Sequence, residues 1–347
     1  MKLVQFVDPK SGDGHVGLVD GGEVIDLSQG EGDPRSVYDI YYSAGGDAGD
    51  AFEATIAQLA QSSGAAGRFQ LAELMAARSE GSAPYLVKPV SGPEGDPHAL
   101  RTWLAGVTHE DSAKLREIEA KQATGDSVNV YELKYRECAA GGRPELFSKG
   151  DPDTVVGHGE ALTRPDDTER LVPETELVSV YGLNRSGQVE RLGYTGGNDA
   201  TDNGIEAANP LNLPQAKNWS GGCASLGPVL VLASAFDDSD VTVSCEILRD
   251  GKRVGYKEGR TGQSNLNMPE GLFHMERSLF SRIPLAPGQL QAFYWGTPIV
   301  FGEADLADGL LVGDLVRMEF SGGIGVLENP IEGQQPSDQL RSLSSRE

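Results

Sequence analysis

The chain is poor in the residues that build sulfur and histidine sites. Its three cysteines, Cys138, Cys223 and Cys245, lie far apart and form no C-x-x-C pair. An odd number of widely spaced cysteines disfavours both a disulfide framework and a zinc–thiolate site. The five histidines lack the spacing of a histidine metal site. We therefore expect the cysteines to be small, buried apolar residues.

The sequence also lacks long apolar runs. No segment approaches the roughly 18 apolar residues that a membrane-spanning helix needs. The first six residues, MKLVQF, predict a strand and have none of the features of a signal peptide. We expect no membrane partner and a cytoplasmic location.

Positive charge is scarce. The chain has 29 Lys and Arg residues and 52 Asp and Glu residues, which gives a net charge of −23. Because phosphate binding needs a basic face, a nucleic-acid partner is not expected. The acidic excess is dispersed rather than gathered in a tail, which indicates an acidic surface around an ordinary core. Halophilic proteins use such surfaces, so we expect a salt-loving source; an ordinary acidic bacterial protein is the alternative.

The N-terminal quarter predicts a small α+β domain over residues 1–90. Short alternating segments separated by Asp-Gly and Gly-Gly turns predict strands over residues 2–7, 15–19 and 23–27. Helical periodicity follows between residues 37 and 77. Closely spaced prolines from Pro84 onward then mark a connection, where we expect a domain boundary.

Strands dominate the larger part of the chain. Residues 177–183 and 188–195 flank an Asn-Arg-Ser-Gly turn and predict a hairpin. Few helices and many glycine turns favour a β-rich α+β fold over an alternating βαβ fold. We expect a second domain over residues 91–332 and a disordered tail over residues 333–347, which are rich in Ser, Gln and charge.

Acidic residues flank this expected hairpin. Glu174 and Glu176 are two apart at the entry of the first strand, so their side chains point to the same face. Asp199 follows the second strand in the segment GGNDATD. Two carboxylates held so close repel each other unless a cation lies between them. Mg²⁺ binds a few carboxylates and keeps coordination positions open for water and substrate. Acidic surface residues and an ordinary Asn-Asp loop are the alternatives.

The order of several weak motifs is more specific than any one of them. Glu-x-Glu, a hairpin, Asn-Asp, Lys217 eighteen residues on, Leu-Gly-Pro, Gly-Thr-Pro with Thr297, and Gly-Ile-Gly before Asn-Pro follow one another. This order resembles the catalytic domain of the fumarylacetoacetate hydrolase superfamily over residues 103–330. The resemblance implies a mixed β-roll, often homo-oligomeric, and we expect a dimer or tetramer.

The resemblance also implies roles for single residues. Glu174, Glu176 and Asp199 would bind the divalent metal, which we expect to be Mg²⁺, with Mn²⁺ or Ca²⁺ as alternatives. Lys217 and Thr297 would contact the substrate.

Two further segments bear on the branch of the superfamily. The segment GVTHEDS at residues 106–112 departs from the Asn-Tyr-x-x-His pattern of the hydrolases. Together with RPELFSK at residues 143–149, it resembles the 2-keto-3-deoxy-pentonate dehydratases, in which the position of Glu145 lies near the substrate. The implied reaction converts 2-keto-3-deoxy-D-xylonate or D-arabinonate to 2,5-dioxopentanoate. A C–C bond hydrolase of an acylpyruvate and a non-enzymatic, metal-stabilised binding protein are the alternatives.

The sequence indicates the residues that act as general acid and general base less clearly than it indicates the metal ligands. Glu145 or Lys217 is expected to transfer protons, and Glu110 is a further candidate. Glu110 could instead be a first-turn acid of a helix expected over residues 112–122. His109 either donates to the substrate or is a solvated loop histidine.

Overall fold

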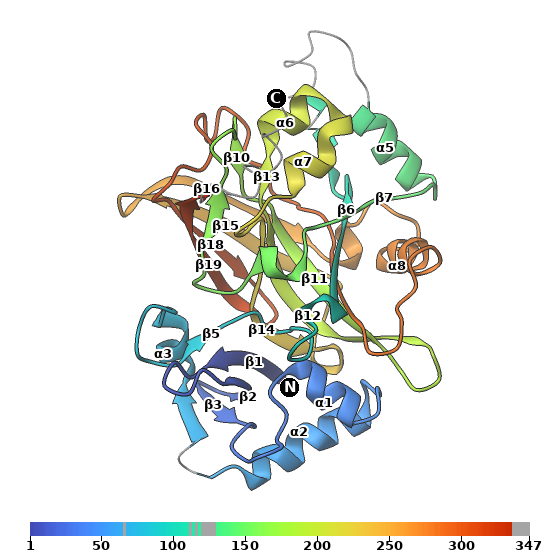
Figure 1. The fold of residues 1–347 in the computed structure, drawn as a ribbon. Coiled ribbons are helices and arrows are strands. Elements are labelled where there is room, and N and C mark those ends of the chain that lie inside the picture. The colour runs from blue at the N-terminus through green and yellow to red at the C-terminus, as the bar shows by residue number, and fades with distance from the viewer. Residues whose placement is uncertain (65–66, 111–112, 115–116, 119–129, 335–347) are drawn as a thin grey trace, which may run out of the picture.

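The computed structural model describes residues 1–64, 67–110, 113–114, 117–118 and 130–334. Within them the chain folds into two large β-sheets with short helices around them (Figure 1). Most of the helix expected over residues 112–122 lies outside the described residues, and so does nearly all of the tail expected from residue 333.

The larger sheet contains the N-terminal strands and has twelve strands among the described residues. Ten follow the order β4-β3-β2-β1-β14-β12-β11-β17-β6-β7, while β5 pairs with β1 and β8 with β14. Their bounds are β1 (Lys2–Val7), β2 (Gly14–Asp20), β3 (Glu23–Asp26), β4 (Arg68–Gln70), β5 (Tyr85–Leu86), β6 (Leu100–Gly106), β7 (Glu145–Ser148), β8 (Val155–Val156), β11 (Thr175–Leu183), β12 (Val189–Asp199), β14 (Ala224–Leu232) and β17 (Leu290–Tyr294).

A second sheet follows the order β16-β15-β18-β19-β9, and β10 pairs with β13. Their bounds are β9 (Leu162–Arg164), β10 (Leu171–Val172), β13 (Thr201–Asp202), β15 (Val241–Arg249), β16 (Lys252–Thr261), β18 (Leu315–Phe320) and β19 (Gly325–Gly333). The predicted β-rich α+β fold is confirmed, and so are the strands expected in the first 27 residues and the hairpin β11–β12.

Short helices lie at both ends of the molecule. In Figure 1, α1 and α2 lie beside the N-terminal strands, whereas α5, α6 and α7 gather at the opposite end. None of the helices in the described part of the chain is long and apolar enough to cross a membrane. The α-helix bounds are α1 (Val37–Ser43), α2 (Asp50–Ser62), α3 (Leu71–Ala76), α5 (Val130–Ala139), α6 (Asn203–Ala208), α7 (Leu213–Lys217) and α8 (Leu272–Phe280).

The N-terminal strands join the sheet of the larger part. Lys2 and Leu3 of β1 pair with Val231 and Leu230 of β14. Leu3 and Leu230 also share one hydrophobic cluster with Phe52 of α2. The N-terminal segment therefore extends the sheet that carries β11 and β12, and the boundary near residue 90 stays a prediction.

The central strands are covered on both faces. All nine residues of β14 and the first eight of β11 are buried. Two glycines of β12 allow this dense packing, because a Cβ on Gly196 would lie 2.4 Å from the Phe320 ring and one on Gly197 would lie 2.3 Å from Tyr294. The three cysteines are buried and free, as expected.

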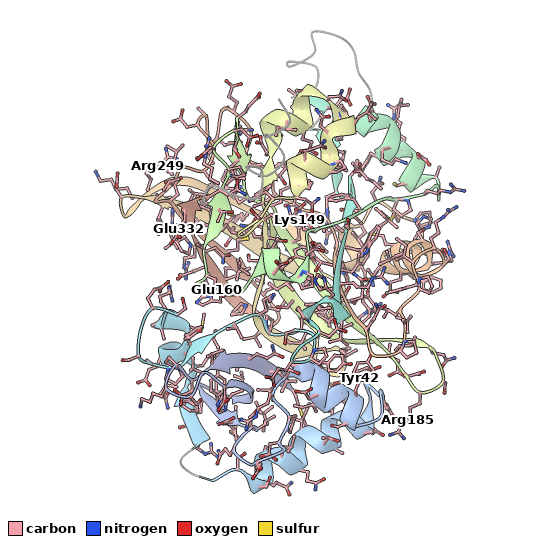
Figure 2. All side chains as sticks on the ribbon, viewed as in Figure 1. Tyr42, Lys149, Glu160, Arg185, Arg249 and Glu332 are labelled. Atoms are coloured by element: carbon pink, nitrogen blue, oxygen red, sulfur yellow. The ribbon has the colours of Figure 1, made fainter. Side chains whose placement is uncertain are left out.

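Charged side chains mostly lie at the outside of this packing. Figure 2 shows Arg185 and Glu332 near the periphery, whereas Lys149 lies in the interior. A fully buried lysine needs a compensating partner.

Candidate metal centre

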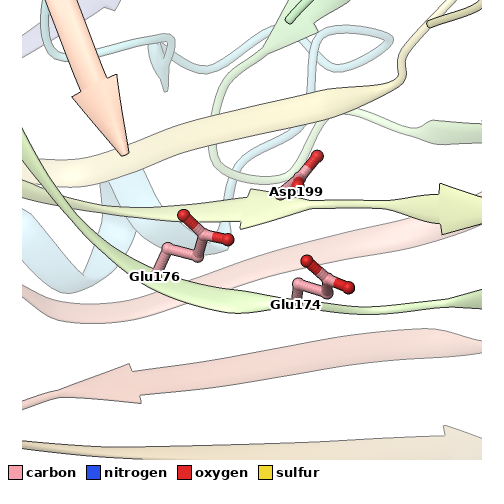
Figure 3. A group of neighbouring side chains, drawn as sticks. All are labelled: Glu174, Glu176 and Asp199. Atoms are coloured by element: carbon pink, nitrogen blue, oxygen red, sulfur yellow. The ribbon is translucent and has the colours of Figure 1, made fainter. Parts of the chain in front are cut away.

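Three carboxyl groups converge where two neighbouring strands meet. Glu174 immediately precedes β11 and Glu176 is its second residue, while Asp199 is the last residue of β12. The antiparallel register places Glu176 opposite Gly197, and the Asp199 N–H donates to the Glu174 carbonyl oxygen at 2.9 Å. One carboxylate oxygen from each of the three residues lies within 4.8 Å of the other two (Figure 3). The structure thus brings the three predicted ligands together.

The buried charge of this triad favours a cation. Each of the three residues is at most 5% exposed. Burial first, and then the charges of Asp199 and Glu174, raise the pKa of Glu176 well above its ordinary value. The Gly296 N–H opposes this rise by donating to Glu176 Oε2 at 2.8 Å. Three hard oxygen donors that repel one another are suited to a divalent ion such as Mg²⁺, so these residues fit the expected metal.

Lys217 reaches the triad from the end of α7. Its Nζ lies 3.0 Å from Glu174 Oε2 and 2.7 Å from Asp199 Oδ2. It also donates to the Thr201 hydroxyl at 2.7 Å, and the residue is only 3% exposed. Lys217 therefore neutralises part of the triad's charge and holds two of its carboxylates in place.

A second ammonium group contacts the same aspartate. Lys149 follows β7, and its Nζ lies 2.5 Å from Asp199 Oδ1 and donates to the Ala200 carbonyl oxygen at 2.6 Å. Lys149 is not among the residues that the sequence predicts for the site. Its one signal was its place in the RPELFSK segment, four residues after Glu145.

The triad opens into a small cavity of about 30 Å³. Among the described residues that line it, five carry carboxyl groups and one carries an ammonium group, so a divalent cation would reduce a large excess of negative charge. The lining residues are Ala105, Gly106, Val107, Ala113, Tyr131, Glu145, Phe147, Glu174, Glu176, Asp199, Glu206, Leu213, Lys217, Gly296 and Thr297. Glu206 of α6 was not predicted from the sequence either, because one acidic residue among 52 does not stand out.

Glu145 is the cavity residue best suited to accept a proton. It begins β7 opposite Gly106, where a Cβ would lie 2.1 Å from Glu145 Oε2, so glycine makes room for the carboxyl group. Burial, followed by the charge of Glu206, raises the pKa of Glu145 to about 7. The nearby Lys217 and Lys134 act in the opposite direction. A carboxyl group with a pKa near neutrality can both take up and return a proton.

Thr297 lines the cavity next to Gly296. Its hydroxyl donates to the Ile299 carbonyl oxygen at 2.6 Å and accepts from the Ile299 N–H at 3.1 Å. A hydroxyl oxygen has two lone pairs, so the Thr297 oxygen can accept one more hydrogen bond from a ligand.

The structure does not bring the other two predicted residues to the cavity lining. His109 is 3% exposed, and its Nδ1 and Nε2 lie 2.9 Å and 3.1 Å from the hydroxyls of Thr108 and Thr261. The alternative of a solvated loop histidine is therefore wrong. Glu110 is exposed and forms an ion pair with Lys114 at 2.5 Å. Neither residue is among the described residues that line the cavity, and the roles suggested for them stay predictions.

Comparison with known proteins gives a family and two curated relatives. A family model described as fumarylacetoacetate (FAA) hydrolase C-terminal matches residues 120–332. The 2-dehydro-3-deoxy-D-arabinonate dehydratase of Saccharolobus solfataricus is 32% identical over 248 residues, which are 71% of this chain and 74% of that protein. A probable 2-keto-3-deoxyxylonate dehydratase of Haloferax volcanii is 33% identical over 235 residues, 67% of this chain and 72% of that protein.

A solved structure is similar over nearly the whole chain. It is 2-keto-3-deoxy-D-arabinonate dehydratase complexed with magnesium and 2,5-dioxopentanoate. The likeness has a TM-score of 0.67 at 25% identity and covers 97% of this chain and 100% of the other.

Proposed function

Because the chain belongs to the fumarylacetoacetate hydrolase family, we propose that it is a magnesium-dependent hydro-lyase. Its substrate is 2-keto-3-deoxy-D-xylonate or D-arabinonate, and its product is 2,5-dioxopentanoate. The observation that carries this proposal is the buried carboxylate triad, which shares one cavity with Glu145 and Lys217. Two curated relatives named as dehydratases of such sugar acids, at 32% and 33% identity, support it.

Glu174, Glu176 and Asp199 would hold the magnesium ion. When bound, Mg²⁺ acts as a Lewis acid that stabilises the negative charge developing on a 2-keto acid as its C3 loses a proton. The burial of the three ligands keeps water away, and this strengthens electrostatic stabilisation in the cavity.

Residues of the cavity transfer the protons and bind the substrate. Glu145 takes the proton from C3 in its ionised form. It then returns a proton to the C4 hydroxyl, which leaves as water. A proton moves from C5 to C3, and the resulting enol becomes the C5 aldehyde of the product. Lys217 donates a hydrogen bond to the substrate's carboxylate, while Thr297 accepts a hydrogen bond from a substrate hydroxyl.

The assembly and location follow from the same likeness. We infer that the chain works as a homo-oligomer, a dimer or a tetramer, in the cytoplasm. The oligomer is supported by what the family resemblance implies. The location is supported by the likeness to two relatives that are named as dehydratases.

A direct assay separates this function from its alternative. The purified protein is incubated with Mg²⁺ and either 2-keto-3-deoxy-D-xylonate or fumarylpyruvate, and the semialdehyde product and acylpyruvate cleavage are followed. We expect semialdehyde from the sugar acid and no cleavage of fumarylpyruvate. The Glu145→Gln protein is the matched control, since it keeps the triad but lacks the proposed base. Cleavage of fumarylpyruvate without semialdehyde formation would replace the proposal with C–C hydrolysis.

A further inference from the structure

Lys149 is a buried ammonium group that the proposed reaction does not use. Its side chain is fully buried, and it is not among the described residues that line the cavity. Its Nζ lies 5.2 Å from the centre of the Trp219 ring, in addition to its contacts with Asp199 and Ala200. Lys149 therefore acts on the protein, behind the triad, and not on a ligand in the cavity.

Lys149 and Lys217 share the carboxylate of Asp199. Lys149 contacts Oδ1 and Lys217 contacts Oδ2, at 2.5 and 2.7 Å. Asp199 is 1% exposed, and an unpaired buried charge is costly. A divalent ion would compensate this charge, but the chain must also fold before the ion arrives. Lys149 supplies that compensation from a position that leaves the cavity open.

We propose that Lys149 is a positioning residue, an internal counter-ion that holds the charge of Asp199 in the metal-free protein and thereby weakens the binding of the divalent ion. The inference rests on the metal site of the proposed function. Two effects on the ion compete. Lys149 orients one ligand, which favours binding, but it also repels a doubly charged ion a few ångströms away. In a buried site, the Coulomb repulsion between the Lys149 ammonium group and the divalent ion exceeds the conformational entropy of the Asp199 side chain. The net effect of Lys149 is therefore to lower the affinity for the ion.

The Lys149→Met variant tests this inference by its stability with and without metal. Thermal unfolding is measured at pH 8 in EDTA and in saturating Mg²⁺, and Mg²⁺ binding is measured by titration calorimetry. In EDTA the melting temperature is expected to fall by about 5–15 °C, because a buried charge loses its partner. Mg²⁺ should restore most of this loss, and the dissociation constant for Mg²⁺ should fall at least about tenfold.

Lys88→Met is the matched control. Lys88 is a half-buried lysine whose Nζ donates to the Pro152 carbonyl oxygen at 2.5 Å and whose nearby carboxylates are Glu160 and Asp153. The same substitution there should lower the melting temperature equally in EDTA and in Mg²⁺.

The outcomes separate this inference from the proposed function. Equal losses of Lys149→Met in EDTA and in Mg²⁺ would mean that Lys149 only packs, and the inference would be overturned while the metal site stands. A wild-type protein that binds no Mg²⁺ would overturn both. If Lys149→Met does not fold in EDTA, the double variant Lys149→Met/Asp199→Asn decides, because it removes both charges. It should fold in EDTA where Lys149→Met does not, and a double variant that also fails to fold would contradict the counter-ion role.

Discussion

Replacing Glu145 by glutamine should stabilise the metal-free protein at alkaline pH while removing its activity. The pKa of Glu145 rises from 4.5 to about 7 on folding, chiefly through burial. A difference of this size corresponds to about 3 kcal/mol between the two protonation states. Because the folded-state value is the higher one, the stability that Glu145 provides is fully present below pH 4.5 and is lost as the pH rises through 7. Glutamine stays neutral and avoids this loss.

Urea unfolding in EDTA at pH 4.5 and pH 8 measures the effect. At pH 8 the Glu145→Gln protein should exceed the wild type in unfolding free energy by up to about 3 kcal/mol, and at pH 4.5 the two should differ little. The rate of semialdehyde formation should fall by about 10²–10⁴-fold, as expected for a lost general base. In the wild type, kcat/KM should rise as the pH passes through about 7 and level off above it, because Glu145 ionises over this range.

An exposed glutamate provides the comparison. Glu319 lies on β18 with its side chain exposed, so Glu319→Gln should change stability little at either pH. If Glu145→Gln gave the same difference from the wild type at both pH values, the carboxyl group would not have a raised pKa in the folded protein. The assignment of Glu145 as the base would then lose its electrostatic support.

Three further predictions concern metal binding, stability at acidic pH and stability at high salt. Glu176→Gln should raise the melting temperature in EDTA by removing one of three buried like charges, and should abolish the Mg²⁺-induced rise seen by thermal unfolding in the wild type. Burial lowers the pKa of His109 to about 4, so its contribution to stability is present above pH 6.5 and is lost as the pH falls toward 4. His109→Gln should therefore lose less stability than the wild type over that range in urea unfolding. With a net charge of −23, the unfolding free energy should rise as KCl is increased to molar concentrations, and equal stability in dilute buffer would contradict the predicted halophilic surface.

The features that depend on neighbouring residues were predictable from the sequence. The Glu-x-Glu pair and Asp199 flank one antiparallel hairpin, whose geometry alone brings strand entry and strand exit together. The family inferred from the order of the motifs is confirmed by the match over residues 120–332. The β-rich fold was predicted from the strand patterns and glycine turns, and the mixed β-roll from the order of the motifs.

The features that depend on distant residues were not predictable. Lys149 meets Asp199 from fifty residues away along the chain, and nothing in a lone lysine indicates burial. His109 is held by Thr261, which lies on β16 far along the sequence. Likewise, the pairing of β1 with β14 joins the N-terminal segment to the large sheet through an edge that local patterns do not encode.

A crystal structure of the protein with Mg²⁺ and a bound 2-keto acid such as pyruvate tests the central claim most directly. We expect one ion whose ligands include a carboxylate oxygen of Glu174, Glu176 and Asp199 at about 2.1 Å, with the keto and carboxylate oxygens of the acid and a water molecule completing its octahedral shell. An ion bound elsewhere, or a triad that stays empty in excess Mg²⁺, would contradict it.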